Sequence, residues 1–338
     1  MATVVDVHTH VVPGVIRERR GSGTQWPSIV KDATGDEASV VIGGRVFRRI
    51  DSRCWDVSRR LADMRDDHVD FQVLSPMPEL LSHWLAPDDA EALAEIVNTD
   101  IARMIVERPD RFSGIGMVCM QDRDRALRQL QTLKAQGLRG IEIGSHINGV
   151  PLGHETLFPI FEAAQDLGLC VFVHPLHPAG MERIGSAPDF GAIAAFPLET
   201  ALAAVSLLAH GVLEKLPKLR ILLSHGGGAL PWILPRIDHG WSLGGNAQKL
   251  IKHKPSEIAR RFWYDTIVYD EEALRLMASK LGHEHIVVGS DYPFSIRQLL
   301  PGDFASRSLG IDSPSGHANA ESFLDIAVDA RPIAEEAR

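Results

Sequence analysis

Three segments of the sequence each join a run of apolar, largely β-branched residues to a metal-binding side chain at its end. They are residues 4–10 (VVDVHTH), 169–175 (LCVFVHP) and 286–293 (IVVGSDYP). Each has the composition of a β-strand bounded by turn-forming residues. Barrel enzymes place their chemistry at the C-terminal ends of parallel strands, so these side chains are predicted to share one site. Three imidazoles and one carboxylate there would suit a zinc-like ion with an open position for water.

The four candidate ligands are His8, His10, His174 and Asp291. His8 and His10 are two residues apart, and the period of a strand turns both side chains to the same face. Each residue also has a structural interpretation: the pair as solvated histidines, His174 as a hydrogen-bonded core histidine, and Asp291 as the start of a turn. The metal interpretation is favoured because all four fall at the same end of strands scattered along the chain.

A fourth segment, residues 219–228 (LRILLSHGGG), predicts a different role for its histidine, His225. Glycines let a backbone approach a ligand closely, and the helix start that follows is expected to leave amide donors free for an anion. His225 would then handle a proton beside the water on the metal. The alternative is an ordinary glycine-rich turn between a strand and a helix.

Composition indicates one large globular domain spanning residues 1–338. Hydrophobic residues make up 45% and charged residues 23%, and no apolar stretch is long enough to span a membrane. No signal peptide is evident, and the three cysteines are too few and scattered for a disulfide framework, so a cytoplasmic location is expected. The net charge of -9 argues against nucleic acid or an anionic membrane as partner. An anionic substrate therefore needs a local arginine cluster.

Strand and helix patterns alternate regularly, which predicts an α/β fold of the (β/α)8 TIM-barrel type rather than a doubly wound sheet. After the first strand, further strands are predicted at 69–74, 112–118, 140–143 and 262–267. Three more strands are predicted to end at residues 174, 225 and 291. The intervening helices are predicted at 56–67, 87–107, 124–136, 158–166, 198–210 and 271–280.

One insertion interrupts this alternation, at residues 13–55. Two β-prone runs, 38–42 and 45–50, flank a Gly-Gly pair, which is typical of a β-hairpin. Inserted after the first strand, the hairpin would project above the metal end of the barrel as a lid or substrate clamp. The alternative is that its arginines only form a solvated edge; they are Arg45, Arg48 and Arg49.

Taken together, the motifs HTH, VHP, SHGGG and GSDYPF resemble those of the amidohydrolase superfamily, and more narrowly of its non-oxidative decarboxylase branch. The resemblance covers nearly the whole chain. It implies that His8, His10, His174 and Asp291 hold a single zinc ion. It also implies that His225 is the acid–base residue rather than a tight ligand.

The resemblance further implies that Arg48 and Arg236 grip substrate carboxylates, with Arg236 reaching in from the neighbouring subunit of a homodimer. Two departures from the family pattern bear on the substrate. Residues 181–196 lack the expected tryptophan, and residues 242–245 (SLGG) replace a basic residue expected soon after Trp241.

A single metal is expected because dinuclear members of the superfamily use a carbamylated lysine near the end of the fourth strand. No lysine occurs between Lys134 and Lys215. Three histidines and one aspartate suit zinc, and manganese or iron fit the same ligand types.

The predicted reaction is loss of carbon dioxide from an unsaturated or aromatic carboxylic acid. The metal would lower the pKa of its bound water towards about 7, His225 would carry the proton, and the arginines would hold the carboxylates. Hydrolysis of a lactone or amide, and hydration of a dicarboxylic enol, need the same water and base and remain alternatives. A non-enzymatic metal-binding role would instead require a closed site without exchangeable water.

Overall fold

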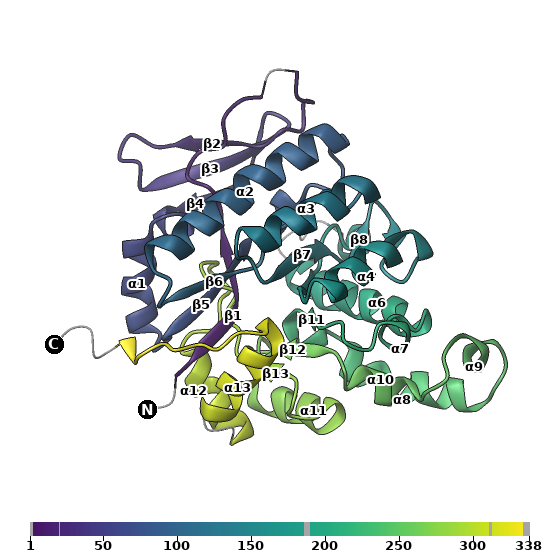
Figure 1. The fold of residues 1–338 in the computed structure, drawn as a ribbon. Coiled ribbons are helices and arrows are strands. Elements are labelled where there is room, and N and C mark those ends of the chain that lie inside the picture. The colour runs from purple at the N-terminus through teal and green to yellow at the C-terminus, as the bar shows by residue number, and fades with distance from the viewer. Residues whose placement is uncertain (1–2, 20, 186–189, 311–312, 334–338) are drawn as a thin grey trace.

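The structure is a computed structural model that describes residues 3–19, 21–185, 190–310 and 313–333. Its central parallel strands alternate with helices (Figure 1). These strands are β1 (Val5–Val11), β5 (Phe71–Pro76), β6 (Phe112–Gly114), β7 (Gly140–Gly144), β10 (Cys170–His174), β11 (Ile221–Leu223), β12 (Trp263–Asp265) and β13 (Ile286–Val287).

The parallel strands form two sheets, of order β1-β5-β6 and β13-β12-β11-β10-β7. One isolated parallel bridge joins Thr9 to Tyr292, and another joins Gly116 to Ile141, so each end of one sheet meets an end of the other. The predicted α/β alternation is confirmed. Because these junctions are single bridges rather than ladders, the pairing does not show a closed barrel.

Seven helices follow the parallel strands in alternation within the described ranges, and two more come after β13. They are α1 (Val57–Asp66), α2 (Pro87–Glu107), α3 (Arg123–Ala135), α4 (Phe158–Asp166), α6 (Phe196–Ala209), α8 (Leu230–Ser242) and α11 (Glu271–Leu281), then α12 (Pro301–Leu309) and α13 (Ser313–Leu324). Shorter helical segments are η1 (Ser52–Cys54), η2 (Pro78–Leu81), η3 (Glu155–Leu157), η4 (Met181–Ile184), η5 (Gly191–Ala195), α7 (Val212–Lys215), η6 (His225–Gly227), α9 (Asn246–Leu250) and α10 (Pro255–Ala259). The side chain of Asp56 accepts a hydrogen bond from the Arg59 amide and so caps α1. None of the described helices is long and apolar enough to cross a membrane.

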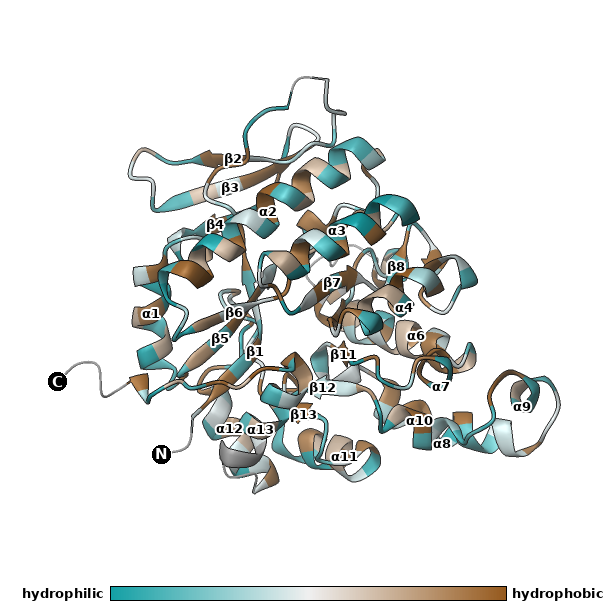
Figure 2. Cartoon of the chain, viewed as in Figure 1, coloured by the Kyte–Doolittle hydropathy of each residue, from teal (hydrophilic) through white to brown (hydrophobic). Residues whose placement is uncertain are grey.

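Apolar side chains pack on both faces of the strands. The helices turn hydrophobic residues towards the strands and hydrophilic ones outward, as the mixed colours of α2 and α3 illustrate (Figure 2). A second cluster fills the space enclosed by the strands and includes Val7, Phe172 and Leu222. Phe323 of α13 belongs to that inner cluster, so the last helix packs against the enclosed core. Buried on both faces, these strands are rigid supports for side chains at their ends.

The insertion after β1 forms a separate antiparallel sheet of order β2-β3-β4. Its strands are β2 (Ser28–Lys31), β3 (Glu37–Ile42) and β4 (Arg45–Asp51). Gly43 and Gly44 make the β3–β4 turn with φ values of 59° and 72°, a conformation that favours glycine. The sequence did not predict β2. A short hairpin of β8 (His146–Ile147) and β9 (Val150–Pro151) follows β7.

Two predicted strand ends are wrong in a way that matters for the site. β11 stops at Leu223 and β13 stops at Val287, so His225 and Asp291 lie in the turns that follow these strands. Both residues have left-handed backbone conformations, with φ of 55° and 68°, and a strand cannot continue through such a residue. The predicted third strand is also shorter, because β6 ends at Gly114.

Candidate metal and catalytic site

The predicted site residues meet in a buried cluster at the C-terminal ends of the strands. His8 and His10 come from β1 and His174 from β10, whereas His225 and Asp291 come from the turns after β11 and β13. The ring centre of His174 lies 5.4 Å from that of His8, 5.1 Å from His10 and 5.2 Å from His225. Segments nearly 300 residues apart in sequence therefore place these side chains within direct reach of one another.

Three of the histidines use Nδ1 to contact an acceptor outside the cluster. His8 Nδ1 lies 2.7 Å from Asp265 Oδ2, His10 Nδ1 lies 2.8 Å from the carbonyl oxygen of Pro76, and His174 Nδ1 lies 3.0 Å from that of Pro175. A carbonyl or carboxylate oxygen only accepts, so each Nδ1 carries the hydrogen. Each neutral ring then has its lone pair on Nε2.

The Nε2 lone pairs and the aspartate carboxylate point to a common centre. His8 Nε2 lies 3.0 Å from His10 Nε2, and Asp291 Oδ1 lies 3.2 Å from His10 Nε2 and 3.6 Å from His8 Nε2. His174 Nε2 is buried and has no hydrogen-bond partner among the described residues. Ligand atoms about 2.0–2.2 Å from one ion lie about 3–3.5 Å from each other. Since neighbouring lone pairs and a carboxylate repel, these residues fit a divalent cation.

His225, in the turn after β11, belongs to the same group. Ligand atoms of His8, His174, His225 and Asp291 all lie within 4.8 Å of one another. His225 Nδ1 is buried without a hydrogen-bond partner among the described residues. Five side chains therefore surround the centre: the four predicted ligands and His225, which was predicted to lie beside the metal but outside the ligand set. Which four of them bind the metal remains a prediction.

Burial and charge set protonation states that suit metal binding for most of the cluster. Burial lowers the pKa of His174 well below the ordinary histidine value and also lowers that of His225. Burial alone would raise the pKa of Asp291, but its hydrogen bond with His10 brings it below the usual range. His10 differs, because Asp291 and Glu142 raise its pKa despite burial. When no metal ion is bound, a protonated His10 would balance the negative charge of Asp291.

The glycines after His225 have a different purpose from the one predicted. The five amides of residues 225–229 all donate to acceptors within the protein, so the glycine turn itself offers no free amide to an anion. A Cβ atom on Gly228 would collide with the carbonyl oxygen of Pro197. The glycines allow close packing of the chain on itself at this turn.

Sequence reasoning missed Asp265, the last residue of β12. It is fully buried and contacts both His8 and the backbone of His225. Its signal was available, because the predicted seventh strand contains this acidic residue near its C-terminal end. Glu142 of β7 was also missed: it is fully buried, its Oε2 lies 3.9 Å from His10 Nδ1, and burial raises its pKa to about 8.

Arg48 lies on β4 and is linked to the cluster through one aromatic ring. Its guanidinium carbon is 4.4 Å from the ring centre of Phe294, and that ring stacks on His10 at 5.1 Å. Arg48 Nη2 also donates to Glu79 Oε1 at 3.0 Å. The second oxygen of Glu79 is buried and has no partner in the described parts of the chain. The insertion thus brings one cation to the edge of the site.

Arg236 does not reach this chain's own cluster through any described contact. It is exposed on α8, one turn after Trp232, whose exposed fraction is 78%. Other large apolar side chains on or near α6 are also exposed: Phe190, Ile193, Leu198 and Leu202. α6 and α8 are in contact, and these exposed side chains together with Trp232 are called here the α6–α8 face.

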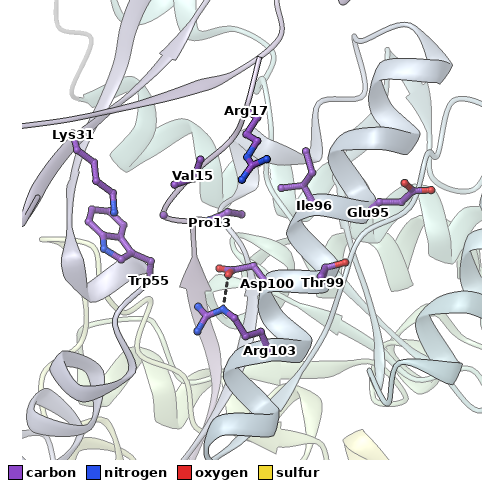
Figure 3. Close-up of a pocket in the computed structure, with 11 residues that line it drawn as sticks. Pro13, Val15, Arg17, Lys31, Trp55, Glu95, Ile96, Thr99, Asp100 and Arg103 are labelled. Atoms are coloured by element: carbon purple, nitrogen blue, oxygen red, sulfur yellow. Dashed lines mark hydrogen bonds and ion pairs between the residues drawn. The ribbon is translucent and has the colours of Figure 1, made fainter. Parts of the chain in front are cut away.

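A separate pocket of about 650 Å³ lies between the insertion, Trp55 and α2 (Figure 3). It is open to solvent and contains the cations Arg17, Lys31 and Arg103. Lys31 Nζ lies 4.4 Å from the ring centre of Trp55, and Arg103 pairs with Asp100 at 3.0 Å. No member of the histidine cluster lines this pocket.

Comparisons with known proteins identify the family of this chain. The amidohydrolase family model matches residues 5–313, so the chain belongs to the amidohydrolase family. A relative named 2-amino-3-carboxymuconate-6-semialdehyde decarboxylase, from Dictyostelium discoideum, is 37% identical over 305 residues, covering 88% of this chain and 84% of the relative. A protein of the same name from Caenorhabditis elegans is 30% identical over 353 residues, covering 88% and 87%.

A solved structure of 5-carboxyvanillate decarboxylase from Novosphingobium aromaticivorans matches with a TM-score of 0.72 and 27% identity, covering 81% of this chain and 83% of that one. It contains bound manganese and a nitrobenzoic acid. The resemblance predicted from the motifs, to the decarboxylase branch of the superfamily, is confirmed. These relatives are named as carboxy-lyases, as expected for this enzyme.

Proposed function

We propose that this protein is a metal-dependent, non-oxidative decarboxylase of 2-amino-3-carboxymuconate-6-semialdehyde or a close analogue. The observation that carries the proposal is the convergence of three oriented Nε2 lone pairs and one carboxylate on a single centre. The names of the two curated relatives support this substrate over an aromatic acid. Residues 181–196 lack the tryptophan expected from the family pattern, so the proposal includes a close analogue of this semialdehyde as the substrate.

We assign His8, His10, His174 and Asp291 as the metal ligands and His225 as the acid–base residue. The metal is a single divalent ion, zinc in our proposal, while the manganese in the solved relative supports the class of ion. Bound there, it would act as a Lewis acid that stabilises negative charge and acidifies water. His225 faces the same centre, and its buried Nδ1 has no hydrogen-bond partner in the part of the chain that the structure describes, so His225 is placed to take or deliver the substrate proton.

Arg48 binds a substrate carboxylate in this proposal, with the insertion 13–55 acting as the clamp. Its position beside Phe294, which stacks on His10, supports this role. Glu79 already pairs with Arg48, so a substrate carboxylate must share or replace that contact. A guanidinium can pair with two carboxylates because it presents five donors in a planar fork. The eight parallel strands act as one (β/α)8 barrel that holds the ligands.

Arg236 binds a carboxylate in the active site of a second subunit. The α6–α8 face supports a homodimer, because a patch of exposed apolar side chains beside a cation is typical of a protein interface. We also propose a reducing, cytoplasmic location, because Cys54, Cys119 and Cys170 are all free and buried.

A substrate panel tests the proposed function. Metal-replete protein is incubated with 2-amino-3-carboxymuconate-6-semialdehyde, hydroxybenzoates, lactones and dicarboxylic enols, while ultraviolet absorbance and carbon dioxide are followed. We expect carbon dioxide release with the semialdehyde at the highest kcat/KM. Turnover of a lactone or an enol without carbon dioxide would replace the decarboxylase by a hydrolase or a hydratase.

A further inference from the structure

The carboxylate of Asp265 contacts both a proposed metal ligand, His8, and the proposed acid–base residue, His225. Asp265 Oδ2 accepts hydrogen bonds from His8 Nδ1 at 2.7 Å and from the His225 amide at 2.9 Å. Its Oδ1 accepts from the amides of Gly226 at 2.9 Å and Ile267 at 3.1 Å. Asp265 is fully buried at the end of β12, so four donors converge on a group that solvent does not reach.

The contact with His8 determines which ring nitrogen faces the metal. An ionised carboxylate only accepts hydrogen bonds, so it keeps the hydrogen on Nδ1 and leaves the lone pair on Nε2. Without this acceptor, the buried His8 ring could place its hydrogen on Nε2 instead. That tautomer could not donate a lone pair to the cation from the side that faces His10 and Asp291.

The contact with the His225 amide holds an unfavourable backbone conformation. His225 has φ of 55°, which costs free energy for a residue with a Cβ atom and persists only when neighbouring contacts enforce it. Asp265 accepts from the amides of both His225 and Gly226, the first two of the four consecutive left-handed residues 225–228. The direction of the His225 ring towards the cluster therefore depends on Asp265.

We propose, given the metal-dependent function proposed above, that Asp265 is a positioning residue that couples the His8 tautomer to the placement of His225. It contacts neither substrate nor metal, and it acts through the two histidines. Asp70 provides a matched control, because it is also a buried aspartate, but within the described ranges its carboxylate accepts only from backbone amides, of Val4 at 2.9 Å and Ile333 at 2.7 Å. The Val4 amide lies just before β1, at the opposite end of that strand from the cluster, and the Ile333 amide belongs to the C-terminal segment.

The test compares Asp265→Asn with Asp70→Asn, using cobalt(II) as the probe metal. An asparagine replaces one carboxylate oxygen by an NH2 group, which cannot accept from the donor pair that it faces. Either His8 and the His225 amide, or the amides of Gly226 and Ile267, then lose their acceptor. We expect Asp265→Asn to bind cobalt about 10–100-fold more weakly and to change its visible d–d spectrum. Asp70→Asn should lower thermal stability while keeping affinity within about twofold and the spectrum unchanged. A folded Asp265→Asn with wild-type affinity and spectrum would overturn the proposal.

A measurement on the wild-type protein covers the case in which Asp265→Asn does not fold. Nitrogen-15 NMR of the histidine rings in metal-free protein should show His8 with its hydrogen on Nδ1. Finding the hydrogen on Nε2 would refute the role of Asp265. If the wild type binds no cobalt while His8 has the expected tautomer, the metal-dependent function fails and the Asp265 contact stands.

Discussion

Each ligand histidine is oriented by the atom that its Nδ1 contacts, and each acceptor comes from a different part of the chain. His8 depends on Asp265, His10 on the carbonyl of Pro76, and His174 on the carbonyl of Pro175. Because hydrogen bonds outside the cluster fix all three tautomers, the ligand atoms are prearranged before a metal binds. Removing a ligand should therefore affect metal binding more than folding.

His174→Ala should lose the metal. The wild type is expected to bind about one divalent ion per chain, and the variant removes a buried Nε2 that has no hydrogen-bond partner among the residues that the structure describes. Elemental analysis of dialysed protein measures both values, with circular dichroism to confirm that the variant folds. Two ions per wild-type chain, or an unchanged metal content in the variant, would rule out the proposed site.

His225→Asn should keep the metal but lower the turnover rate by about a hundredfold or more, because it removes general acid–base assistance. Steady-state kinetics together with metal analysis separate the two effects. Near-normal turnover would contradict the acid–base role. Loss of metal would instead show that His225 is a ligand. This outcome is measured because a ligand atom of His225 lies within 4.8 Å of those of His8, His174 and Asp291.

At the scale of elements, β7 is tied to the segment after η2 through a buried histidine. His83 Nε2 accepts a hydrogen bond from the Gly144 amide at 3.0 Å. Burial, with smaller contributions from His146 and His177, lowers the pKa of His83 to about 3. The unfolded chain therefore binds a proton below about pH 6.5 that the folded protein does not bind until about pH 3.

Folding stability should thus fall as the pH is lowered from 6.5 towards 3, by about 1.4 kcal/mol per pH unit from this residue once the unfolded histidine is protonated. His83→Gln removes the titration, so its stability should change less steeply over this range. Denaturant unfolding at pH 6.0, 5.0 and 4.5 compares the two proteins. Equal slopes would show that His83 does not titrate as described.

The sequence was sufficient to predict most elements but not their ends. Long periodic helices such as α2 and α4 match their predicted bounds, since amphipathic patterns identify them well. β11 and β13 are shorter than predicted, because the positive φ of His225 and Asp291 is invisible in an apolar pattern. β2 was missed because it has only four residues.

For the site, residue type and spacing were enough to predict which side chains gather, because strand ends of this fold class meet. They could not predict the residues that orient them. Asp265 and Glu142 are acidic residues near the ends of predicted strands, which is a signal in the sequence, but only the three-dimensional contacts show which side chains they face. The role of the glycines after His225 was also beyond the sequence, because it depends on how closely Pro197 approaches.

Across the molecule the net charge is -9, so binding an anionic substrate requires positively charged side chains to be concentrated at the active site. Arg48 reaches the site from the insertion, whereas Arg236 lies exposed beside the α6–α8 face. If Arg236 serves the partner's active site, neither subunit is complete alone. The proposed dimer would then be required for catalysis.

Mixing two inactive variants tests this shared site. Arg48→Ala and Arg236→Ala homodimers should each be nearly inactive, since each lacks one carboxylate contact in both sites. After subunit exchange, a heterodimer has one intact site and one doubly altered site. Random reassortment gives half heterodimers, so activity should recover to about a quarter of the wild-type value. If subunits exchange and no activity returns, Arg236 acts within its own chain or not at all.

The most direct test of metal-dependent decarboxylation is a zinc titration of metal-free protein, with carbon dioxide release from 2-amino-3-carboxymuconate-6-semialdehyde as the readout. The rate should rise linearly with added zinc and level off at about one ion per chain, because one set of ligands converges on one centre. Carbon dioxide release that is unaffected by removing the metal, or that levels off only at two ions per chain, would contradict the proposed mononuclear enzyme.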